Sequence, residues 1–272
     1  MRVVQDEVDF SSYLLSIGNG TAQVHMEIGD DMIQIPKEFL VESVDALIDK
    51  VFPTIFEHYA DRYFVAHRAI LTPKNENVDR INEIIMAKFP GEQKTYLSAD
   101  SVAEENLDNT YPNEFLNSIT LSGMPPHSMS LKIGAPVMLL RNLRAGPGTG
   151  LRNGTRMIIL HLGQRVIEVE IASGVNKGKH VLIPRITIAP SDTELPFTLK
   201  RRQFPIRPCF AMSTNKAQGQ TLDFVGIYLP DHVFTHGQLY VALSRVRNPK
   251  SIAVHLNNHD GYTKNIVYKE VL

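Results

Sequence analysis

The chain has 272 residues, of which 43% are hydrophobic and 21% are charged, a composition typical of a globular protein with one large domain or two smaller ones. Its single cysteine, Cys209, excludes an internal disulfide and fits a reducing compartment. No apolar run approaches about 18 residues, and the N-terminus has no hydrophobic signal region. We therefore expect an intracellular protein with no membrane partner.

The two halves of the chain carry opposite charge. Residues 1–130 hold 9 Lys and Arg against 21 Asp and Glu, whereas residues 131–247 hold 16 against 6, so the second half favours a polyanionic partner. The alternative is that these basic residues are ordinary solvated surface groups or face the acidic half, because charge alone is a weak indicator.

Residues 1–66 contain short helical patterns and no catalytic constellation. Apolar residues at helical spacing predict one helix over residues 10–17, which Gly18 ends, and another over residues 43–52, which Pro53 ends.

A strand, a polar turn and a helix follow one another over residues 68–88. Thr72, Pro73, Lys74 and Asn75 form the turn, and a helical pattern continues to about residue 88. In open α/β sheets ligands meet such turns at the carboxyl ends of the strands. Alternatively, Asn75 only caps its helix and Pro73 only ends the strand.

Residues 90–130 are rich in turn residues and read as a loop-rich connection with short elements. From residue 131 the pattern changes to short apolar runs separated by Gly and Asn, which predicts a small antiparallel barrel. The expected strands cover residues 135–140, 157–160, 166–171 and 181–183.

Two further strands, at residues 210–212 and 224–229, enclose a polar turn at residues 213–221. Thr235 and Gln238 have the spacing of a helix capping box, so a helix is predicted from about His236. Gln238 and Arg245 are seven residues apart, about two helical turns, and are expected on the same polar face.

This region carries a family resemblance. Asn-Lys-Ala-Gln-Gly-Gln-Thr at 215–221 and Gln-Leu-Tyr-Val-Ala-Leu-Ser-Arg-Val at 238–246 resemble the fifth and sixth helicase motifs of Pif-one-family superfamily-one DNA helicases, especially those of Helitron-type transposons. Thr-Pro-Lys-Asn at 72–75 resembles the fourth motif. Residues 132–140 and 151–156 resemble the opening of the family's barrel.

The resemblance implies an α/β fold: a RecA-like second motor lobe with an inserted small antiparallel β-barrel of the Src-homology-three type. Residues 67–130 and 208–272 would form the lobe, and residues 131–207 the barrel. Residues 1–66 would be the tail of the first motor lobe and a linker.

The implied activity is that of the C-terminal half of an ATP-dependent DNA helicase, acting in the nucleus with single-stranded DNA and the first RecA-like lobe as partners. ATP and Mg²⁺ would be held mainly by that first lobe. Arg245 would be the arginine finger, and Gln238 would join it as a catalytic residue. The residues that would bind DNA are Thr72, Asn75, Lys216, Gly219, Gln220, Thr221, Arg152 and Asn153.

Simpler explanations remain open for each of these residues. Arg245 could bond the end of its own helix, the capping box alone explains Gln238, and Lys216 could be an ordinary turn lysine. No phosphate-binding G-x-x-x-x-G-K-[ST] string occurs, because Gly178-Lys179 is followed by His180, so we do not expect this chain to hydrolyse ATP alone.

No metal site is expected. The pairs His232/His236 and His255/His259 have i, i+4 spacing, but neither has a third ligand nearby. Two other functions fit the residues: a non-catalytic DNA-binding module derived from such a helicase, and a protein-interaction module that docks an acidic partner.

Overall fold

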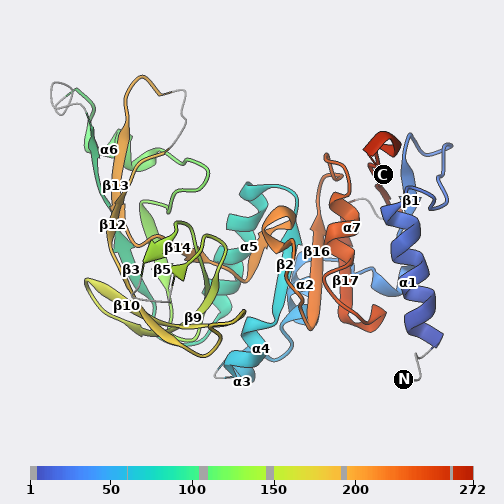
Figure 1. Cartoon of the computed structure of the whole chain (residues 1–272), viewed down its shortest axis with the longest axis horizontal. Coiled ribbons are helices and arrows are strands. Elements are labelled where there is room, and N and C mark those ends of the chain that lie inside the picture. Colours follow the sequence, from blue (N-terminus) through green and yellow to red (C-terminus); the bar gives the residue numbers. More distant parts are fainter. Residues whose placement is uncertain are drawn as a thin grey trace. The chain divides into compact units, whose positions relative to one another are not determined.

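The computed structural model describes residues 5–59, 61–103, 110–144, 150–190, 195–257 and 260–271. It divides into two compact units (Figure 1). Unit 1 consists of Met1–His58, His67–Ile85 and Phe210–Leu272, and unit 2 of Tyr59–Ala66 and Met86–Cys209.

Unit 1 is built on a parallel four-stranded sheet with the order β15-β2-β16-β17. Its strands are β2 (Arg68–Thr72), β15 (Ala211–Ser213), β16 (Phe224–Leu229) and β17 (Ile252–Leu256). Ile70 pairs with Ala211 on one side and Gly226 on the other, so segments about 140 residues apart in sequence are neighbours. The strands are almost entirely buried, as expected of a parallel sheet covered on its faces.

Helix α2 (Val44–Val51) packs against β16 in unit 1. The Ser43 hydroxyl caps the helix by accepting from the Ala46 N–H at 3.1 Å. The contact is close at Gly226, where an added Cβ would lie 2.6 Å from a methyl group of Val51. The strand therefore needs a glycine at this position to admit the helix.

Helix α5 (Asn75–Lys88) closes the open edge of the sheet through one side chain. The buried Asn82 amide donates to the Ala211 carbonyl at 3.0 Å and accepts from the Ala211 N–H at 2.9 Å. Asn82 thus takes the place of a neighbouring strand for that residue.

The remaining elements of unit 1 surround the sheet. Helix α1 (Gln5–Gly18) contacts α7 (Gln238–Leu243), and β1 (Met32–Gln34) pairs with β18 (Tyr262–Lys264). The 3₁₀ helices are η1 (Lys37–Phe39), η3 (Thr214–Ala217), η4 (Pro249–Ser251) and η5 (Lys269–Val271). Helix α3 covers Ile55–His58. The helices predicted over residues 10–17 and 43–52 are confirmed within α1 and α2.

Unit 2 contains a five-stranded antiparallel sheet with the order β11-β10-β9-β6-β14. The strands are β6 (Pro136–Leu139), β9 (Arg156–Leu162), β10 (Val166–Ile171), β11 (His180–Pro184) and β14 (Ile206–Pro208). The four strands predicted in this region are confirmed. The observed pairings run from edge strand β11 to edge strand β14, and a closed barrel of the Src-homology-three type stays a prediction.

The rest of unit 2 is a second set of short elements. Strands β12 (Ile186–Ile188), β13 (Leu199–Gln203) and β4 (Ala99–Val102) form one sheet. The pairs β3 (Lys94–Leu97) with β5 (Ser128–Leu131) and β7 (Leu143–Arg144) with β8 (Gly150–Leu151) form two more. Helices α4 (Arg62–Ala66) and α6 (Asn113–Ser118) complete it.

This division differs from the domain boundaries expected from the sequence. Residues 86–130, expected with the lobe, cluster with residues 131–209, because β4 pairs with β13 across about 100 residues. Residues 1–66 were expected to be the tail of the first motor lobe and a linker; residues 1–58 cluster with unit 1, where β1 pairs with β18, and residues 59–66 with unit 2. Strand pairings at this separation leave no local signal in the sequence.

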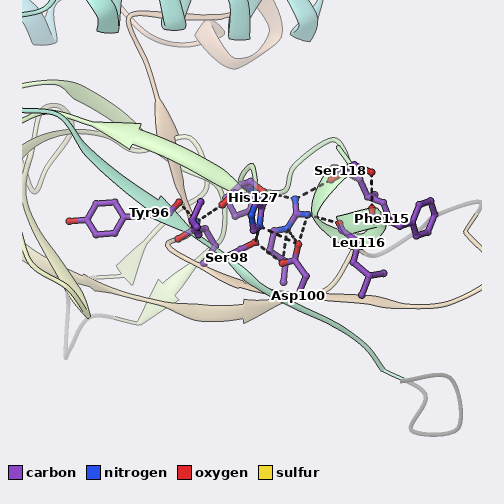
Figure 2. Close-up of polar contacts among 12 residues, drawn as sticks. Tyr96, Ser98, Asp100, Phe115, Leu116, Ser118 and His127 are labelled. Atoms are coloured by element: carbon purple, nitrogen blue, oxygen red, sulfur yellow. Dashed lines mark hydrogen bonds and ion pairs between the residues drawn. The ribbon is translucent and has the colours of Figure 1, made fainter. Parts of the chain in front are cut away.

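A buried ion pair fixes β13 to its neighbours (Figure 2). Arg201 and Asp100 have side chains 1% and 0% exposed, and the closest guanidinium-to-carboxylate distance is 2.7 Å. Arg201 also donates to the carbonyls of Leu116, Ile119 and Pro125. Ser98 donates to the Asp100 carboxylate at 2.7 Å. One guanidinium therefore joins α6, β4 and the segment before β5.

We predict that Asp100→Ala destabilises the folded chain by about 3–5 kcal/mol, because it leaves a buried guanidinium without its counter-charge. Urea unfolding of the two proteins measures the difference. The matched control is Glu170→Ala, which breaks the exposed Arg62–Glu170 pair of the same unit and should cost no more than about 1 kcal/mol. Equal effects of the two substitutions would contradict the central role of Asp100.

Candidate functional site

The carboxyl end of the parallel sheet gathers part of the predicted site. Thr72 ends β2 beside Ser213, which ends β15 and leads into η3. Thr72 is fully buried, and its hydroxyl has no hydrogen-bond partner among the described residues. Asn75 is exposed and is the first residue of α5. In this conformation Asn75, but not Thr72, is accessible to a ligand.

Lys74 connects this turn to the loop after β16. Its ammonium lies 2.8 Å from the Asp231 carboxylate and 3.8 Å from that of Glu76. The hydrogen bond and charge of Asp231 raise the pKa of Lys74, with a smaller contribution from Glu76. The ends of β2 and β16 are thus linked by a charged contact that the sequence did not reveal.

The polar turn after β15 presents exposed donors. Lys216, Gly219 and Thr221 are exposed, and Gln220 is half-buried with its amide donating to the Lys216 carbonyl at 3.0 Å. Gly219 has φ of 77°, which side chains other than glycine rarely adopt, although no atom would crowd an added Cβ. Its glycine is required by the turn conformation.

Arg245 joins this turn to α7. Its Nη1 donates to the carbonyls of Ala217 at 3.3 Å and Gln220 at 3.1 Å. Its Nε donates to the Val241 carbonyl at 2.6 Å, and its Nη2 donates to the Ser244 hydroxyl at 2.7 Å. Burial lowers the pKa of Arg245, yet a guanidinium stays charged at neutral pH.

Arg245 therefore acts as a cationic brace between the two motif segments. It lies beyond the C-terminal end of α7, since that helix stops at Leu243 and Ser244 is its C-cap. The expectation that Gln238 and Arg245 share one helical face is wrong because the helix is shorter than predicted. Arg245 instead follows the C-cap, whereas Gln238 is the first helical residue.

The capping-box interpretation of Gln238 is also wrong. The N-cap is Gly237, in a left-handed conformation with φ of 67°, and no side chain caps the helix. The side-chain oxygen Oε1 of Gln238 instead accepts from the Phe234 backbone N–H at 3.2 Å. Gln238 is 2% exposed, and its Nε2 has no hydrogen-bond partner among the described residues. Such a buried donor is costly unless a ligand or water accepts from it.

Arg152 and Asn153 belong to unit 2, where they form the turn between β8 and β9. Both are exposed, and the Asn153 N–H donates to the Asn142 side chain at 2.8 Å. Gly154 follows with φ of 88°, which permits the tight turn.

Among the described residues, no group of three His, Cys, Asp or Glu side chains could hold a metal ion. His232 lies 3.4 Å from the Thr263 hydroxyl, and His236 accepts from the Tyr268 N–H at 2.9 Å. His255 lies 3.1 Å from the Val41 carbonyl, and His259 lies outside the described residues. In the described part of the chain, no helix is both long and apolar enough to span a membrane.

Comparison with known proteins finds similarity to one family. The model of the DNA helicase Pif1 2B domain matches residues 114–162. The human ATP-dependent DNA helicase PIF1 is 33% identical over 189 residues, covering 68% of this chain and 26% of the relative. The chain is related to the Pif1 DNA helicases. Pif1 of Campylobacter jejuni is 25% identical over 240 residues, covering 85% of this chain and 51% of the relative.

Solved Pif1 structures share the fold. Pif1 helicase from Candida albicans aligns with a TM-score of 0.56 at 21% identity, over 84% of this chain and 56% of that one. Pif1 from Bacteroides, in complex with ADP-AlF3 and single-stranded DNA, aligns with a TM-score of 0.52 at 22% identity, over 86% and 52%. The chain thus spans between about a quarter and about half of the Pif1 helicases compared.

Removing the brace should loosen the turn. We predict that Arg245→Ala speeds hydrogen exchange of the Gln220 and Leu222 amides about tenfold, because the turn loses two charge-assisted hydrogen bonds. Arg247→Ala is the control, since it removes an exposed arginine two residues away. Unchanged exchange at both amides in Arg245→Ala would show that the turn holds its conformation without the guanidinium.

Proposed function

We propose that this chain is the C-terminal half of an ATP-dependent, Helitron-like Pif1 DNA helicase that translocates on single-stranded DNA and unwinds duplex. The observation that carries the proposal is the contact of Arg245 with Ala217 and Gln220, which connects the sixth-motif segment directly to the fifth-motif turn. In a motor, such a connection couples the state of the nucleotide to the grip on the strand.

The donor set suits a triphosphate. Arg245 offers a planar, permanently charged group, and Gln238 has a buried Nε2 without a partner in the described chain, so both residues fit a ligand rich in acceptor oxygens. When bound, ATP with Mg²⁺ supplies the phosphoryl transfer, and the first lobe would hold most of it. The missing G-x-x-x-x-G-K-[ST] string supports the expectation that this chain does not hydrolyse ATP alone.

Arg245 would serve two states in turn. In one state its guanidinium would bond the carbonyls of Ala217 and Gln220, the contacts that the structure has. As the arginine finger it would exchange those acceptors for phosphate oxygens and stabilise the developing charge. The carbonyls of Ala217 and Gln220 would then be released, which lets the turn change its contacts. This exchange gives each nucleotide cycle a direct effect on the strand-binding segment.

Exposed donors of each unit would contact the strand. In unit 1 these are Asn75, Lys216, Gly219 and Thr221, with Gln220 and Thr72 contributing after movement. In unit 2 they are Arg152 and Asn153, on an insert that we propose to be of the Src-homology-three type. Exposed amide, hydroxyl and ammonium groups are the donors that contact nucleic-acid phosphates.

The arginine-finger assignment is tested in a polypeptide that joins this chain to a Pif1-type first lobe. Arg245→Ala is expected to lower DNA-stimulated kcat by about 10³- to 10⁵-fold, the usual effect of losing such a finger. Arg245→Lys should restore little, because an ammonium lacks the planar fork. Arg247→Ala is the control. ATP hydrolysis by Arg245→Ala at the unaltered rate would refute the assignment.

A non-catalytic DNA-binding module is the second candidate, favoured by the exposed Arg152 and Asn153 of unit 2. Both candidates predict that the 272-residue chain alone binds a labelled oligothymidylate of roughly 20 nucleotides. The affinity should fall with salt by a log–log slope of about 0.7 for each phosphate contact. If the chain shows no binding to the oligothymidylate but binds an acidic polypeptide, it would instead be a protein-interaction module.

A further inference from the structure

Three arginines converge on a cavity in unit 2 that none of the helicase motifs includes. The cavity has a volume of about 470 Å³ and is lined by Arg165, Pro184, Arg185 and Arg202. These residues come from three different segments: the β9–β10 hairpin turn, the junction of β11 and β12, and β13. The packing of these segments in the fold, rather than a sequence motif, brings the three arginines together.

Arg185 is held rigidly at this cavity. Its guanidinium lies over the rings of Phe204 at 5.0 Å and Tyr96 at 5.6 Å, and its Nη1 donates to the Leu97 carbonyl at 2.7 Å. Its buried Nε has no partner among the described residues. Aromatic contacts and one hydrogen bond therefore fix the position of a charge whose donors are incompletely used.

The hairpin that carries Arg165 is tied down where β9 ends and its turn begins. Lys94 donates to the Leu162 carbonyl at 2.8 Å, and the Tyr96 hydroxyl donates to the Gly163 carbonyl at 2.7 Å. Gly163 is required here, since an added Cβ would lie 2.4 Å from the Val166 carbonyl oxygen. Arg165, two residues later, is exposed and presented from a fixed turn.

Arg202 lies on the exposed face of β13, because the preceding residue, Arg201, lies on the buried face. Side chains alternate along β13, so buried Arg201 holds the strand through the network of Figure 2 while Lys200 and Arg202 are exposed on the opposite face. Lys200 and Arg202 are two residues apart, roughly 7 Å along the strand. The positive charge of the cavity therefore continues along the outer face of β13.

Three carboxylates on the strands of unit 2 have partners other than the cavity arginines. Glu168 is paired with His180 at 3.2 Å, Glu170 with Arg62, and Asp100 with Arg201. In the described part of the chain, no ion pair involves Arg165, Arg185 or Arg202. Three like charges around one cavity repel one another unless an anion lies between them. The structure thus offers a preorganised anion site.

We propose that this arginine cavity binds one phosphate of a nucleic-acid backbone, with the next phosphate reaching Lys200. A single free phosphate would use the cavity alone, whereas the row of charge along β13 fits a chain of phosphates. The inference rests on the DNA-binding part of the proposed function and adds a contact region away from the motifs. The contact is to the backbone and is therefore independent of base sequence.

The test uses the full 272-residue chain and the oligothymidylate titration in chloride salts. Arg165→Ala and Arg202→Ala are chosen because both side chains are exposed, whereas Arg185 packs on aromatic rings. Because both arginines face the one phosphate of the cavity, the double variant should reduce the log–log salt slope by about 0.7, and each single substitution by no more than that. Lys179→Ala, which removes an exposed charge from the β10–β11 turn of the same unit, should leave the slope unchanged. Thermal unfolding confirms that the variants are folded.

Each result decides between distinct outcomes. Oligonucleotide binding by the unaltered chain with the same slope in the double variant would overturn this inference and leave the proposed function standing. No binding by the unaltered chain would overturn both. Thermal stabilisation by inorganic phosphate that Arg165→Ala/Arg202→Ala abolishes, without a change in the DNA slope, would show a free-phosphate site and refute the nucleic-acid assignment.

Discussion

Arg201 holds unit 2 together by donating to one carboxylate and three backbone carbonyls from inside the protein. Arg156, 2% exposed, joins Ala66 and Cys209 in the same way, through their carbonyls at 2.8 and 3.2 Å. In unit 1, Arg245 connects α7 to the turn at Ala217 and Gln220. A guanidinium has five N–H groups in a fixed plane, so it can satisfy carbonyls from several segments at once. The protein thus uses internal arginines where chain segments distant in sequence must meet.

This use of arginine explains why total charge overstated the basic surface. Arg156 and Arg201 lie inside unit 2, where Arg156 donates to backbone carbonyls and Arg201 pairs with Asp100, so neither presents charge to a partner. The charge that remains outside is concentrated at a few positions, including Arg152 on the β8–β9 turn and the arginine cavity. The positions of these exposed basic side chains, rather than the net charge of unit 2, therefore decide where an anionic partner can bind.

Local patterns in the sequence predicted most strands and helices but not their partners. The short apolar runs that form β9, β10 and β16 were evident because burial requires them. The polar strand Leu199–Gln203 was not, because Arg201 replaces an apolar residue at a buried position and hides the alternation. The Thr235–Gln238 spacing gave a false capping box, since the left-handed Gly237 delays the helix by about two residues.

The sequence identified which residues belong to the candidate site, but not how they contact one another. The motif strings identified Arg245 and the turn at 215–221, but the acceptors of Arg245 are backbone carbonyls, which carry no residue signature. The burial of Thr72 and of the Gln238 Nε2, which has no hydrogen-bond partner among the described residues, likewise depends on tertiary packing. The family resemblance therefore identified the candidate site residues, whereas their contacts could be known only from the folded structure.

Asn82 has a consequence for the border of the parallel sheet. Its amide occupies both the N–H and the carbonyl of Ala211 on β15, a strand at the edge of the sheet. An edge residue with both groups free is a template on which a foreign strand can assemble, the usual route to aggregation. Here the Asn82 side chain of α5 bonds both groups, so neither is free to pair with a foreign strand. Among the described residues, the sheet of unit 1 therefore ends at β15, where a single amide takes the place of a further strand. A longer or charged side chain at Asn82 would reopen the edge.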